Sequence, residues 1–271
     1  MPELPEVETT RRGLSPHCVG QPLERLLVRQ WQLRWPIPRS LPNTIKGREL
    51  IAIQRRGKYL LFVFDCGHAL VHLGMSGSMR IVSPDEPVMK HDHVDWRFGN
   101  GLTARFNDPR RFGALLWTED PIDQHPLLKN LGPEPLHDAF DGEYLFKRSR
   151  KRKQSIKTFI MDSKIVVGVG NIYANEALFL AGIRPGRAAG SLSRTQADQL
   201  ASQIKAVLAK AITVGGTTLR DFVGGDGQPG YFKQSLFVYG REGESCKRCR
   251  SPLKHRSIGQ RATVYCPQCQ S

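Results

Sequence analysis

The C-terminal end of the chain contains two pairs of cysteines with a regular spacing. Cys246 and Cys249 are separated by two residues, as are Cys266 and Cys269, and 16 residues lie between the pairs. This spacing is typical of a four-thiolate zinc site, in which two tight knuckles bring the sulfur atoms to the corners of a tetrahedron. Because four thiolates leave no position for water, we expect one structural zinc ion rather than a catalytic metal.

The remaining cysteines, Cys18 and Cys66, lie outside this module. The start of the chain is acidic and has no central apolar run, so we expect no secretory signal and a reducing, cytoplasmic location. In that compartment these cysteines are free thiols in the core or on the surface. The apolar runs LIAI and YLLFVF are far shorter than the ~20 residues that a membrane-spanning helix needs, so we expect no membrane partner.

The net charge is strongly positive. Forty lysines and arginines stand against 25 acidic residues in a chain of 271, which gives +15. A field of this sign favours association with a polyanion such as nucleic acid. Residues 147–157 hold seven basic side chains among eleven, and a solvated helix face is the plain alternative for that run. The cysteine module is also basic, with Lys247, Arg248, Arg250, Lys254, His255, Arg256 and Arg261.

The pattern of the chain changes near its middle. Up to about residue 135, short β-branched and aromatic runs alternate with Gly, Asn, Asp and Pro, which indicates an antiparallel sandwich or barrel. The turn-rich stretch NLGPEPLHDAFDG then marks a boundary. Further on, a helical pattern is strongest in SLSRTQADQLASQIKAVLAKAI, whose apolar residues Leu200, Ile204, Val207, Leu208 and Ala211 recur at helical spacing.

Two short stretches of the first half stand out. HLGMSG places Met75 at an expected loop tip, and NDPRRFG places Arg110, Arg111 and Phe112 at a turn after a strand. Either stretch alone is better explained by core residues of adjacent strands. Together with the basic surface they fit wedges that fill the space left by a displaced base.

In the second half, VVGVGNIYANEALFLAGI joins a glycine-rich turn to a helix. With a helix on each side, this pattern resembles a helix–turn–helix element that presents backbone N–H groups and Asn171 to phosphate. At the start of the chain, PELPEVE has the proline and glutamates that a first helical turn prefers, so it predicts a helix start.

These motifs, taken in order, resemble one family. PELPEVE, QRRGKYL, HLGMSG, DPRRFG, VVGVGNIYANE, GGTTLRDF, DGQPGYF and the cysteine module together are similar to bacterial formamidopyrimidine-DNA glycosylase, the 8-oxoguanine glycosylase and AP lyase of base-excision repair. The match runs from residue 2 to the last cysteine. It implies an α+β multidomain protein: an N-terminal antiparallel β-sandwich with a leading helix (1–135), a helix–two-turns–helix domain (136–235) and a zinc β-hairpin (236–271).

The resemblance also implies roles for individual residues. Pro2 is the expected nucleophile, Glu3 its acid/base partner, Lys58 a proton donor in β-elimination and Arg261 the residue for δ-elimination and phosphate binding. Residues 217–232 match the loop that closes over the flipped base. Arg152 stands where we expect lysine, which keeps the charge but changes the hydrogen-bond geometry. The remaining matches are to void-filling residues (Met75, Arg110, Phe112), DNA contacts (His91, Arg110, Arg152) and phosphate binders (Lys58, His72, Asn171).

The chemistry fits these residue types. An α-amino group has a reference pKa of ~8 against ~10.4 for lysine, so far more of it is free base at neutral pH. Once Met1 is removed, the secondary amine of Pro2 can attack the sugar C1′ and form an iminium that serves as an electron sink. Glu3 can move protons on the opening sugar, and Glu6 can hold the geometry of this terminus.

Two alternatives remain open. An endonuclease VIII-like enzyme for oxidised pyrimidines also starts with proline and glutamate, but typically has PEGPE and lacks the GGTTLRDF-to-GYF pattern. A non-catalytic zinc-ribbon DNA-binding protein fits the charge and the cysteines but leaves PELPEVE unexplained. We expect double-stranded DNA with oxidised bases as the partner, no obligate protein partner, a monomer, and a place at the bacterial nucleoid.

Overall fold

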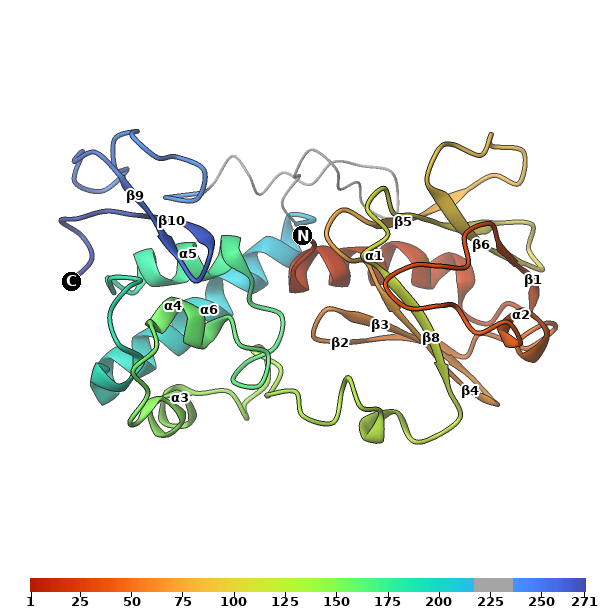
Figure 1. The fold of residues 1–271 in the computed structure, drawn as a ribbon, viewed down its shortest axis with the longest axis horizontal. Coiled ribbons are helices and arrows are strands. Elements are labelled where there is room, and N and C mark those ends of the chain that lie inside the picture. Colours follow the sequence, from red (N-terminus) through yellow and green to blue (C-terminus); the bar gives the residue numbers. More distant parts are fainter. Residues whose placement is uncertain (217–235) are drawn as a thin grey trace. The chain divides into compact units, whose positions relative to one another are not determined.

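The computed structural model describes residues 1–216 and 236–271, which form two compact units (Figure 1). Unit 1 comprises residues 1–129 and 214–216, and unit 2 comprises residues 130–213 and 236–271. The loop expected at residues 217–232 lies outside the described residues.

Unit 1 is a β-sandwich preceded by a long helix. All its strand pairs are antiparallel, in two four-stranded sheets of order β1-β6-β7-β5 and β2-β3-β4-β8. This confirms the predicted N-terminal fold. The elements are α1 (Leu4–Cys18), β1 (Leu23–Val28), α2 (Leu41–Thr44), β2 (Ala52–Arg56), β3 (Tyr59–Phe64), β4 (Gly67–His72), β5 (Ser78–Val82), β6 (Asp92–Phe98), β7 (Thr103–Asn107), β8 (Ala114–Thr118) and the 3-10 turn η1 (Ile122–Gln124).

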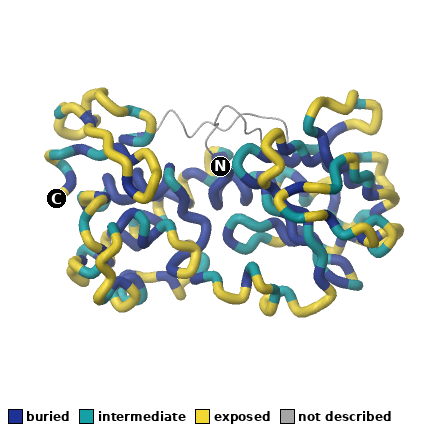
Figure 2. The backbone as a smooth tube through the Cα atoms, in the orientation of Figure 1, coloured by how far each residue is buried: buried dark blue, intermediate teal, exposed yellow. Residues whose placement is uncertain are grey.

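The core of unit 1 lies where the two sheets and α1 meet. Phe62 of β3 and Trp96 of β6 stack with their ring centroids 4.7 Å apart, so the sheets share one apolar layer. Val7 and Leu14 of α1 belong to the same buried cluster. Figure 2 shows the first turn of α1 and much of the central strands as buried. The helix is therefore fixed by burial of its apolar face, which also fixes the position of its first turn.

The first expected strand is shorter than the sequence stretch that predicted it. The stretch PLERLLVRQWQLRW forms a strand only over Leu23–Val28. The chain then leaves the sheet and approaches Pro36 and Pro38, which have no N–H group to donate to a ladder. The guanidinium carbons of Arg34 and Arg39 lie 4.6 and 4.2 Å from the ring centroids of Trp35 and Trp31.

Unit 2 combines helices with a C-terminal hairpin. Its elements are α3 (Gly142–Ser149), α4 (Ile156–Ile160), α5 (Asn171–Leu180), the 3-10 turn η2 (Ala189–Ser191), α6 (Arg194–Thr213), β9 (Lys254–Ile258) and β10 (Arg261–Tyr265). The turns over residues 162–170 separate α4 from α5, which confirms the helix–two-turns–helix prediction. Leu200, Ile204, Val207, Leu208 and Ala211 of α6 are all buried, as their spacing predicts.

The cysteine module packs against α5 within unit 2. Phe179 of α5 shares a buried cluster with Val238, Leu253 and Val264 of the module. The two strands of the hairpin are joined by a two-residue turn at Gly259 and Gln260, both at positive φ. In the part of the chain that the structure describes, no helix has the length and apolar character needed to cross a membrane.

Candidate active site and nucleic-acid interface

The first turn of α1 buries two carboxylates beside Pro2. Glu3 is the N-cap, and its backbone N–H donates to Glu6 Oε2 at 2.9 Å. Glu3 and Glu6 are 2% and 1% exposed, and Pro2 is buried as well. Carboxylates are favoured here because a helix N-terminus carries partial positive charge. The structure thus places all three predicted N-terminal residues together, in a rigid turn.

The chain segment at residues 214–216 meets the same turn. Gly216 has φ of +81°, and a Cβ atom at this position would lie 3.2 Å from Glu6 Oε1. Only glycine adopts this conformation readily at so close an approach. Glu6 therefore borders both the N-terminus and the end of this segment.

Glu8 is a charged residue of α1 that the sequence did not single out. Its carboxylate accepts hydrogen bonds from Arg11 at 2.8 Å, Arg12 at 2.9 Å and Arg55 at 3.1 Å. Burial alone would raise the pKa of Glu8, but the hydrogen bonds and charges of these arginines lower it to about 2. In the sequence, the spacing of three and four residues from Glu8 to Arg11 and Arg12 could have indicated these ion pairs, because such residues share one helix face.

Arg55 connects Glu8 to the turn that holds Lys58. Arg55 lies in β2, and its Nη1 donates to Gly57 O at 3.0 Å. Gly57 and Lys58 form the two-residue turn between β2 and β3, with Gly57 at φ of +58°. The ion pair of Glu8 and Arg55 thus links α1 to the Lys58 turn.

His72 lies on the strand beside Lys58. Its ring centroid is 4.9 Å from that of Tyr59, its cross-strand partner. Burial, followed by the charges of Lys58 and Arg34, lowers the pKa of His72 to about 4. Nδ1 accepts the Gly74 N–H at 3.0 Å, so the ring proton resides on Nε2 at neutral pH. His72 can therefore donate a hydrogen bond to a phosphate as a neutral imidazole and not as a cation.

The turns that carry Met75 and Phe112 are in direct backbone contact. Gly74 has φ of +69°, and a Cβ atom there would lie 2.5 Å from Gly113 N and 2.6 Å from Phe112 C. The Gly113 N–H donates to Asp108 Oδ2 at 2.7 Å, which fixes the second turn. The two predicted wedges thus come from neighbouring turns, because glycine at position 74 permits the approach.

The side chains of the two predicted wedges, Met75 and Phe112, are partly exposed. Met75 is half-buried, and Phe112 is 47% exposed despite its apolar ring. The guanidinium carbon of Arg110 lies 4.8 Å from the Phe112 ring centroid, a cation–π distance. His91, the other predicted DNA contact of this unit, adjoins the same turn, because its carbonyl accepts the Asp108 N–H at 3.0 Å.

In unit 2, two helices hold the tip of the hairpin. Lys157 of α4 is fully buried, and its Nζ donates to Ala262 O at 2.9 Å and Thr263 Oγ1 at 2.7 Å. Asn171, the first residue of α5, donates through Nδ2 to the same Ala262 carbonyl at 3.1 Å. Arg261 is exposed and directly precedes Ala262. Asn171 and Arg261 therefore lie close together. Lys157 fixes the hairpin beside them, and in the sequence it is one basic residue among many.

Arg152 lies on the same unit, in the exposed turn between α3 and α4. Its N–H donates to Ser149 O at 3.0 Å, and its carbonyl accepts the Gly190 N–H at 2.9 Å. The backbone is thus fixed while the side chain is presented to solvent, as a phosphate contact requires.

The four cysteine sulfurs of the module lie within 4.8 Å of one another, which fits a tetrahedral zinc site. Sγ of Cys246 and Cys269 are 3.9 Å apart, and those of Cys249 and Cys266 are 3.4 Å apart. A tetrahedron with Zn–S bonds of about 2.3 Å has S–S edges of about 3.8 Å. The cluster suits one structural zinc ion, which would join the two knuckles.

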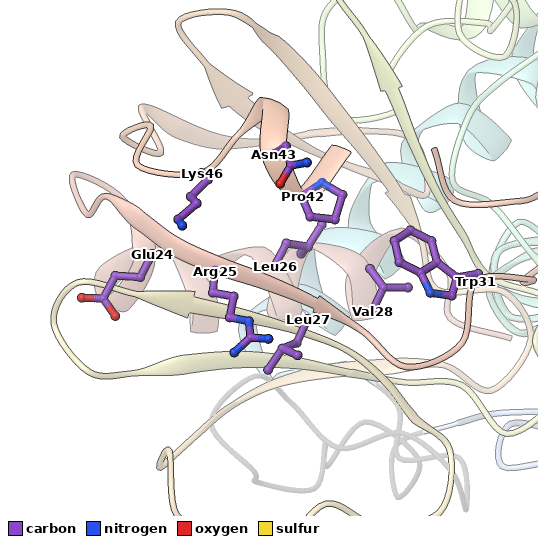
Figure 3. A pocket seen from close by; sticks show the side chains of 9 residues that line it. All are labelled: Glu24, Arg25, Leu26, Leu27, Val28, Trp31, Pro42, Asn43 and Lys46. Atoms are coloured by element: carbon purple, nitrogen blue, oxygen red, sulfur yellow. The ribbon is translucent and has the colours of Figure 1, made fainter. Parts of the chain in front are cut away.

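A pocket of about 550 Å³ lies elsewhere on unit 1, along β1 and α2 (Figure 3). None of the predicted catalytic or DNA-binding residues lines it. Its lining residues are Glu24, Arg25, Leu26, Leu27, Val28, Trp31, Pro42, Asn43 and Lys46.

The predicted residues therefore form two sets, one on each unit. Unit 1 holds the N-terminal turn, the Lys58 turn with His72, and the two wedge turns with His91. Unit 2 holds Arg152, Asn171, Arg261 and the cysteine cluster. The sequence analysis missed the buried charged residues that fix these parts, namely Glu8, Arg105, Lys157 and Glu176.

This architecture of sandwich, helix–two-turns–helix and zinc hairpin defines a class of DNA-repair glycosylases. The family model for the formamidopyrimidine-DNA glycosylase N-terminal domain matches residues 1–115. The H2TH domain of the same family matches residues 131–223, and the zinc finger found in FPG and IleRS matches residues 243–271. The chain belongs to the formamidopyrimidine-DNA glycosylase family.

Full-length relatives agree with this assignment. The chain is 63% identical over 270 residues to formamidopyrimidine-DNA glycosylase of Saccharophagus degradans, with all of both chains covered. It is 58% identical to the enzyme of the same name from Pseudomonas aeruginosa, again over the whole of both chains.

Solved structures of the family share the fold. The MutM (FPG) protein of Thermus thermophilus has a TM-score of 0.89 at 38% identity and covers 99% of this chain and 98% of its own. Lactococcus lactis Fpg in complex with DNA containing N7-benzyl-Fapy-dG has a TM-score of 0.92 at 34% identity, with both chains fully covered. The same enzyme has been solved with DNA containing an abasic site, with a TM-score of 0.91, 34% identity and 99% of each chain covered.

Proposed function

We propose that this protein removes oxidised purines from DNA and cuts the strand through the amine of Pro2. As a member of its family it is a bifunctional DNA glycosylase and AP lyase of base-excision repair. The observation that carries the proposal is the buried Glu3–Glu6 turn, which holds two carboxylates beside Pro2 at the start of α1. Double-stranded DNA with a damaged base is the partner, as for the relatives solved with damaged DNA.

The reaction begins at the nitrogen of Pro2 after removal of Met1. The nitrogen lone pair forms a bond to C1′ while the bond from C1′ to the damaged base breaks, and the base leaves with the proton that the amine gives up. The bond from C1′ to the ring oxygen then breaks as that oxygen takes up a proton, which leaves a cationic iminium. Glu3 is the group placed to supply or accept the proton at the sugar oxygen. Glu6 is a positioning residue, since its carboxylate binds the backbone N–H of Glu3.

Strand cleavage follows from the same iminium. Loss of a proton from C2′ breaks the bond from C3′ to the 3′ phosphate oxygen, and a second elimination breaks the bond from C5′ to the 5′ phosphate oxygen. We assign Lys58 to proton transfer in the first elimination and Arg261 to the second. The fixed Gly57–Lys58 turn and the hairpin tip bound by Lys157 support these roles, because both side chains extend from rigid backbone.

DNA is held by groups from both units. His72 and Lys58 on one unit and Asn171 and Arg152 on the other bind phosphates, and His91 and Arg110 add DNA contacts. Met75 and Phe112 fill the space that the displaced base leaves. The zinc ion, held by Cys246, Cys249, Cys266 and Cys269, stabilises the module that carries Arg261. We also propose a division into three domains, at residues 1–135, 136–235 and 236–271. The proposed location is the cytoplasm, in association with the nucleoid.

Oxidised pyrimidines are a second substrate class, because Lactococcus lactis Fpg has also been solved with DNA containing an oxidised pyrimidine. A substrate panel separates the two classes. Duplexes with 8-oxoguanine opposite cytosine, a formamidopyrimidine or an oxidised pyrimidine are incubated with the full chain, and strand cleavage is measured. We expect faster cleavage of both purine lesions. Faster cleavage of the pyrimidine lesion would contradict the proposed preference.

A further inference from the structure

The loop between β5 and β6, residues 83–91, is an irregular segment that ends at a predicted DNA contact. Val88 and Met89 on it are 51% and 64% exposed, and Lys90 is exposed as well. The loop enters β6 through His91, which has φ of +78°. The loop forms no strand, and several of its backbone polar groups bind side chains instead.

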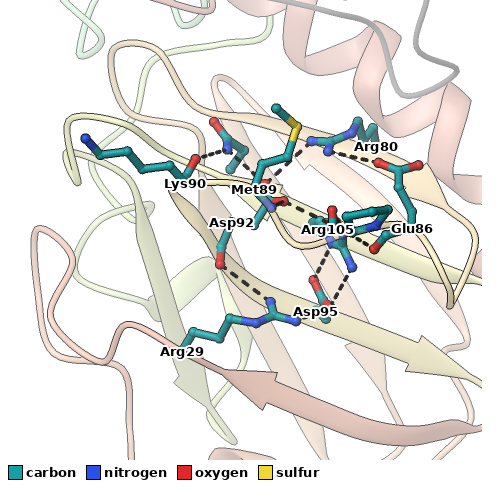
Figure 4. Close-up of polar contacts among 10 residues, drawn as sticks. Arg29, Arg80, Glu86, Met89, Lys90, Asp92, Asp95 and Arg105 are labelled. Carbon is teal, nitrogen blue, oxygen red and sulfur yellow. Dashed lines mark hydrogen bonds and ion pairs between the residues drawn. The ribbon is translucent and has the colours of Figure 1, made fainter.

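Those side chains belong to a polar cluster centred on buried Arg105, Asp92 and Asp95 (Figure 4). Arg105 of β7 is 1% exposed and binds its cross-strand neighbour Asp95 through two hydrogen bonds, Nε to Oδ1 at 2.9 Å and Nη2 to Oδ2 at 3.1 Å. Arg29 binds Asp95 Oδ2 at 2.6 Å. We name this set the Arg105 cluster; its members are Arg29, Arg80, Glu86, Asp92, Asp95, Arg105 and Asn107.

Arg105 also binds the backbone of the loop. Its Nη1 donates to Glu86 O and to Pro87 O, each at 3.1 Å, and lies 3.6 Å from Asp92 Oδ2. The guanidinium group has five donors in a fixed plane, and here they serve a carboxylate and two loop carbonyls at once. Lysine cannot reproduce this geometry, because its ammonium group is a single point of charge.

Asp92 and Asn107 bind the part of the loop nearest His91. The Met89 N–H donates to Asp92 Oδ2 at 2.8 Å, and the Asp92 N–H donates to Met89 O at 3.1 Å. Asn107 Nδ2 donates to Lys90 O at 3.3 Å and to Asp92 Oδ1 at 2.9 Å. Cluster side chains thus bind backbone groups at residues 86, 87, 89 and 90 in turn.

His91 follows this bound segment in a conformation that few residues other than glycine adopt. A left-handed backbone at such a residue costs on the order of 1 kcal/mol and persists only where the surroundings hold it. The cluster holds the preceding residues, and the bond from the Asp108 N–H to His91 O holds the following side. These contacts hold the backbone from which the His91 side chain extends.

We propose that Arg105 and Asn107 are positioning residues for DNA binding, which act by fixing the loop that ends at His91. This inference rests on the proposed role of His91 as a DNA contact. Its physical basis is the Arg105 cluster, in which three arginines and three acidic residues balance in charge. Side chains of this cluster bind backbone groups of a loop that has no regular secondary structure.

The test is a double-mutant cycle on DNA affinity. The Kd of the full, zinc-loaded protein is measured for a duplex with a tetrahydrofuran abasic analogue, using His91→Ala, Asn107→Ala, Arg105→Lys and each double variant with His91→Ala. We expect His91→Ala to weaken binding about tenfold and Asn107→Ala about fivefold. Each double variant should bind like His91→Ala alone, because a displaced loop has no further effect once the His91 side chain is gone.

Arg29→Lys is the matched control. Arg29 binds Asp95 and the Asp92 carbonyl but no residue of the loop from 86 to 91. We expect this variant to lower stability while its Kd stays within twofold of the wild type. Asn107→Ala removes no charge, so the cycle of Asn107 with His91 still tests the inference if Arg105→Lys does not fold. Folding of each variant is checked by circular dichroism at the assay temperature.

The outcomes separate the inference from the proposed function. If the losses in the double variants multiply, Arg105 and Asn107 affect DNA binding independently of His91. If Asn107→Ala and Arg105→Lys bind DNA like the wild type, these residues act only on stability. Either result overturns the inference while His91 keeps its role. If His91→Ala binds DNA like the wild type, the inference falls together with that role, whereas strand cleavage by the same variant still reports on the proposed function.

Discussion

The two units bury charge in different ways. In unit 1, buried charges that join different elements are paired with opposite charges, as in Arg105 with Asp95 and Glu8 with Arg55. The buried carboxylates of Glu6 and Asp108 bind backbone N–H groups only a few residues away in the sequence. In unit 2, buried Lys157 donates to a carbonyl and a hydroxyl, and buried Glu176 accepts the backbone N–H groups of residues 237–239 at 2.7–2.9 Å.

The difference follows from what each unit must join. Unit 1 connects regular strands and a helix, whose side chains face one another in fixed register, so charges on two elements can meet. Unit 2 connects helices to the cysteine module, much of which forms no strand, so that its N–H and C=O groups are not paired in a regular ladder. A charged side chain binds such groups more strongly than a neutral one does. Ion pairs therefore join the regular elements of the sandwich, and charge-to-backbone bonds join the cysteine module to the helices of unit 2.

The largest effect is expected from breaking an ion pair in unit 1. Asp95→Ala leaves Arg105 and Arg29 without their shared carboxylate, and an uncompensated buried charge costs about 3–5 kcal/mol. The free energy of unfolding by urea, followed by tryptophan fluorescence, measures this loss, since all four tryptophans lie in unit 1. Asp65→Ala is the control, because Asp65 and its partner Arg48 are 55% and 50% exposed. A loss above about 1 kcal/mol for that exposed pair would contradict the distinction.

In unit 2 the matching change is Glu176→Ala. Three backbone N–H groups lose their acceptor, at a cost of about 3 kcal/mol. Because these N–H groups of residues 237–239 belong to the cysteine module, we expect faster release of zinc to a chelator. Glu176→Gln retains an acceptor oxygen and should give an intermediate rate. If Glu176→Ala released zinc at the wild-type rate, the bonds to residues 237–239 would not hold the module.

A smaller, pH-dependent effect is expected at Glu8. Its pKa falls from 4.5 to about 2 on folding, so the folded state is stabilised above pH 4.5, and this contribution is lost as the pH falls toward 2. Glu8→Gln should lower the free energy of unfolding by about 2 kcal/mol at pH 7 and by much less near pH 2. Urea unfolding at both pH values measures the difference. An equal loss at both would show that the charge of Glu8 is not what stabilises the helix.

The sequence predicted the features that depend on local pattern. The spacing of the four cysteines specified a zinc site, and the period of α6 identified its buried residues. It also placed the turns of Met75 and Phe112, because glycines flank the first and Asp–Pro begins the second.

The Arg105 cluster escaped prediction for a physical reason. Asp95 and Arg105 belong to different strands, and they become partners only through the register of β6 against β7. In the sequence each is one of several polar residues of its strand, and nothing there marks it as the buried one. Lys157 was hidden in the same way, since its bonds join it to residues more than a hundred positions away. The charge of His72 was likewise set by burial and by Lys58, which a lone histidine in the sequence does not reveal.

The central claim is that the amine of Pro2 forms the covalent bond to DNA. The direct measurement is borohydride trapping on a duplex with 8-oxoguanine opposite cytosine, followed by proteolysis and mass spectrometry of the cross-linked peptide, for protein shown by intact mass to lack Met1. We predict that the sugar remnant is found on Pro2, and that Pro2→Gly alters or abolishes trapping. An adduct on Lys58, or no adduct at all, would contradict the account.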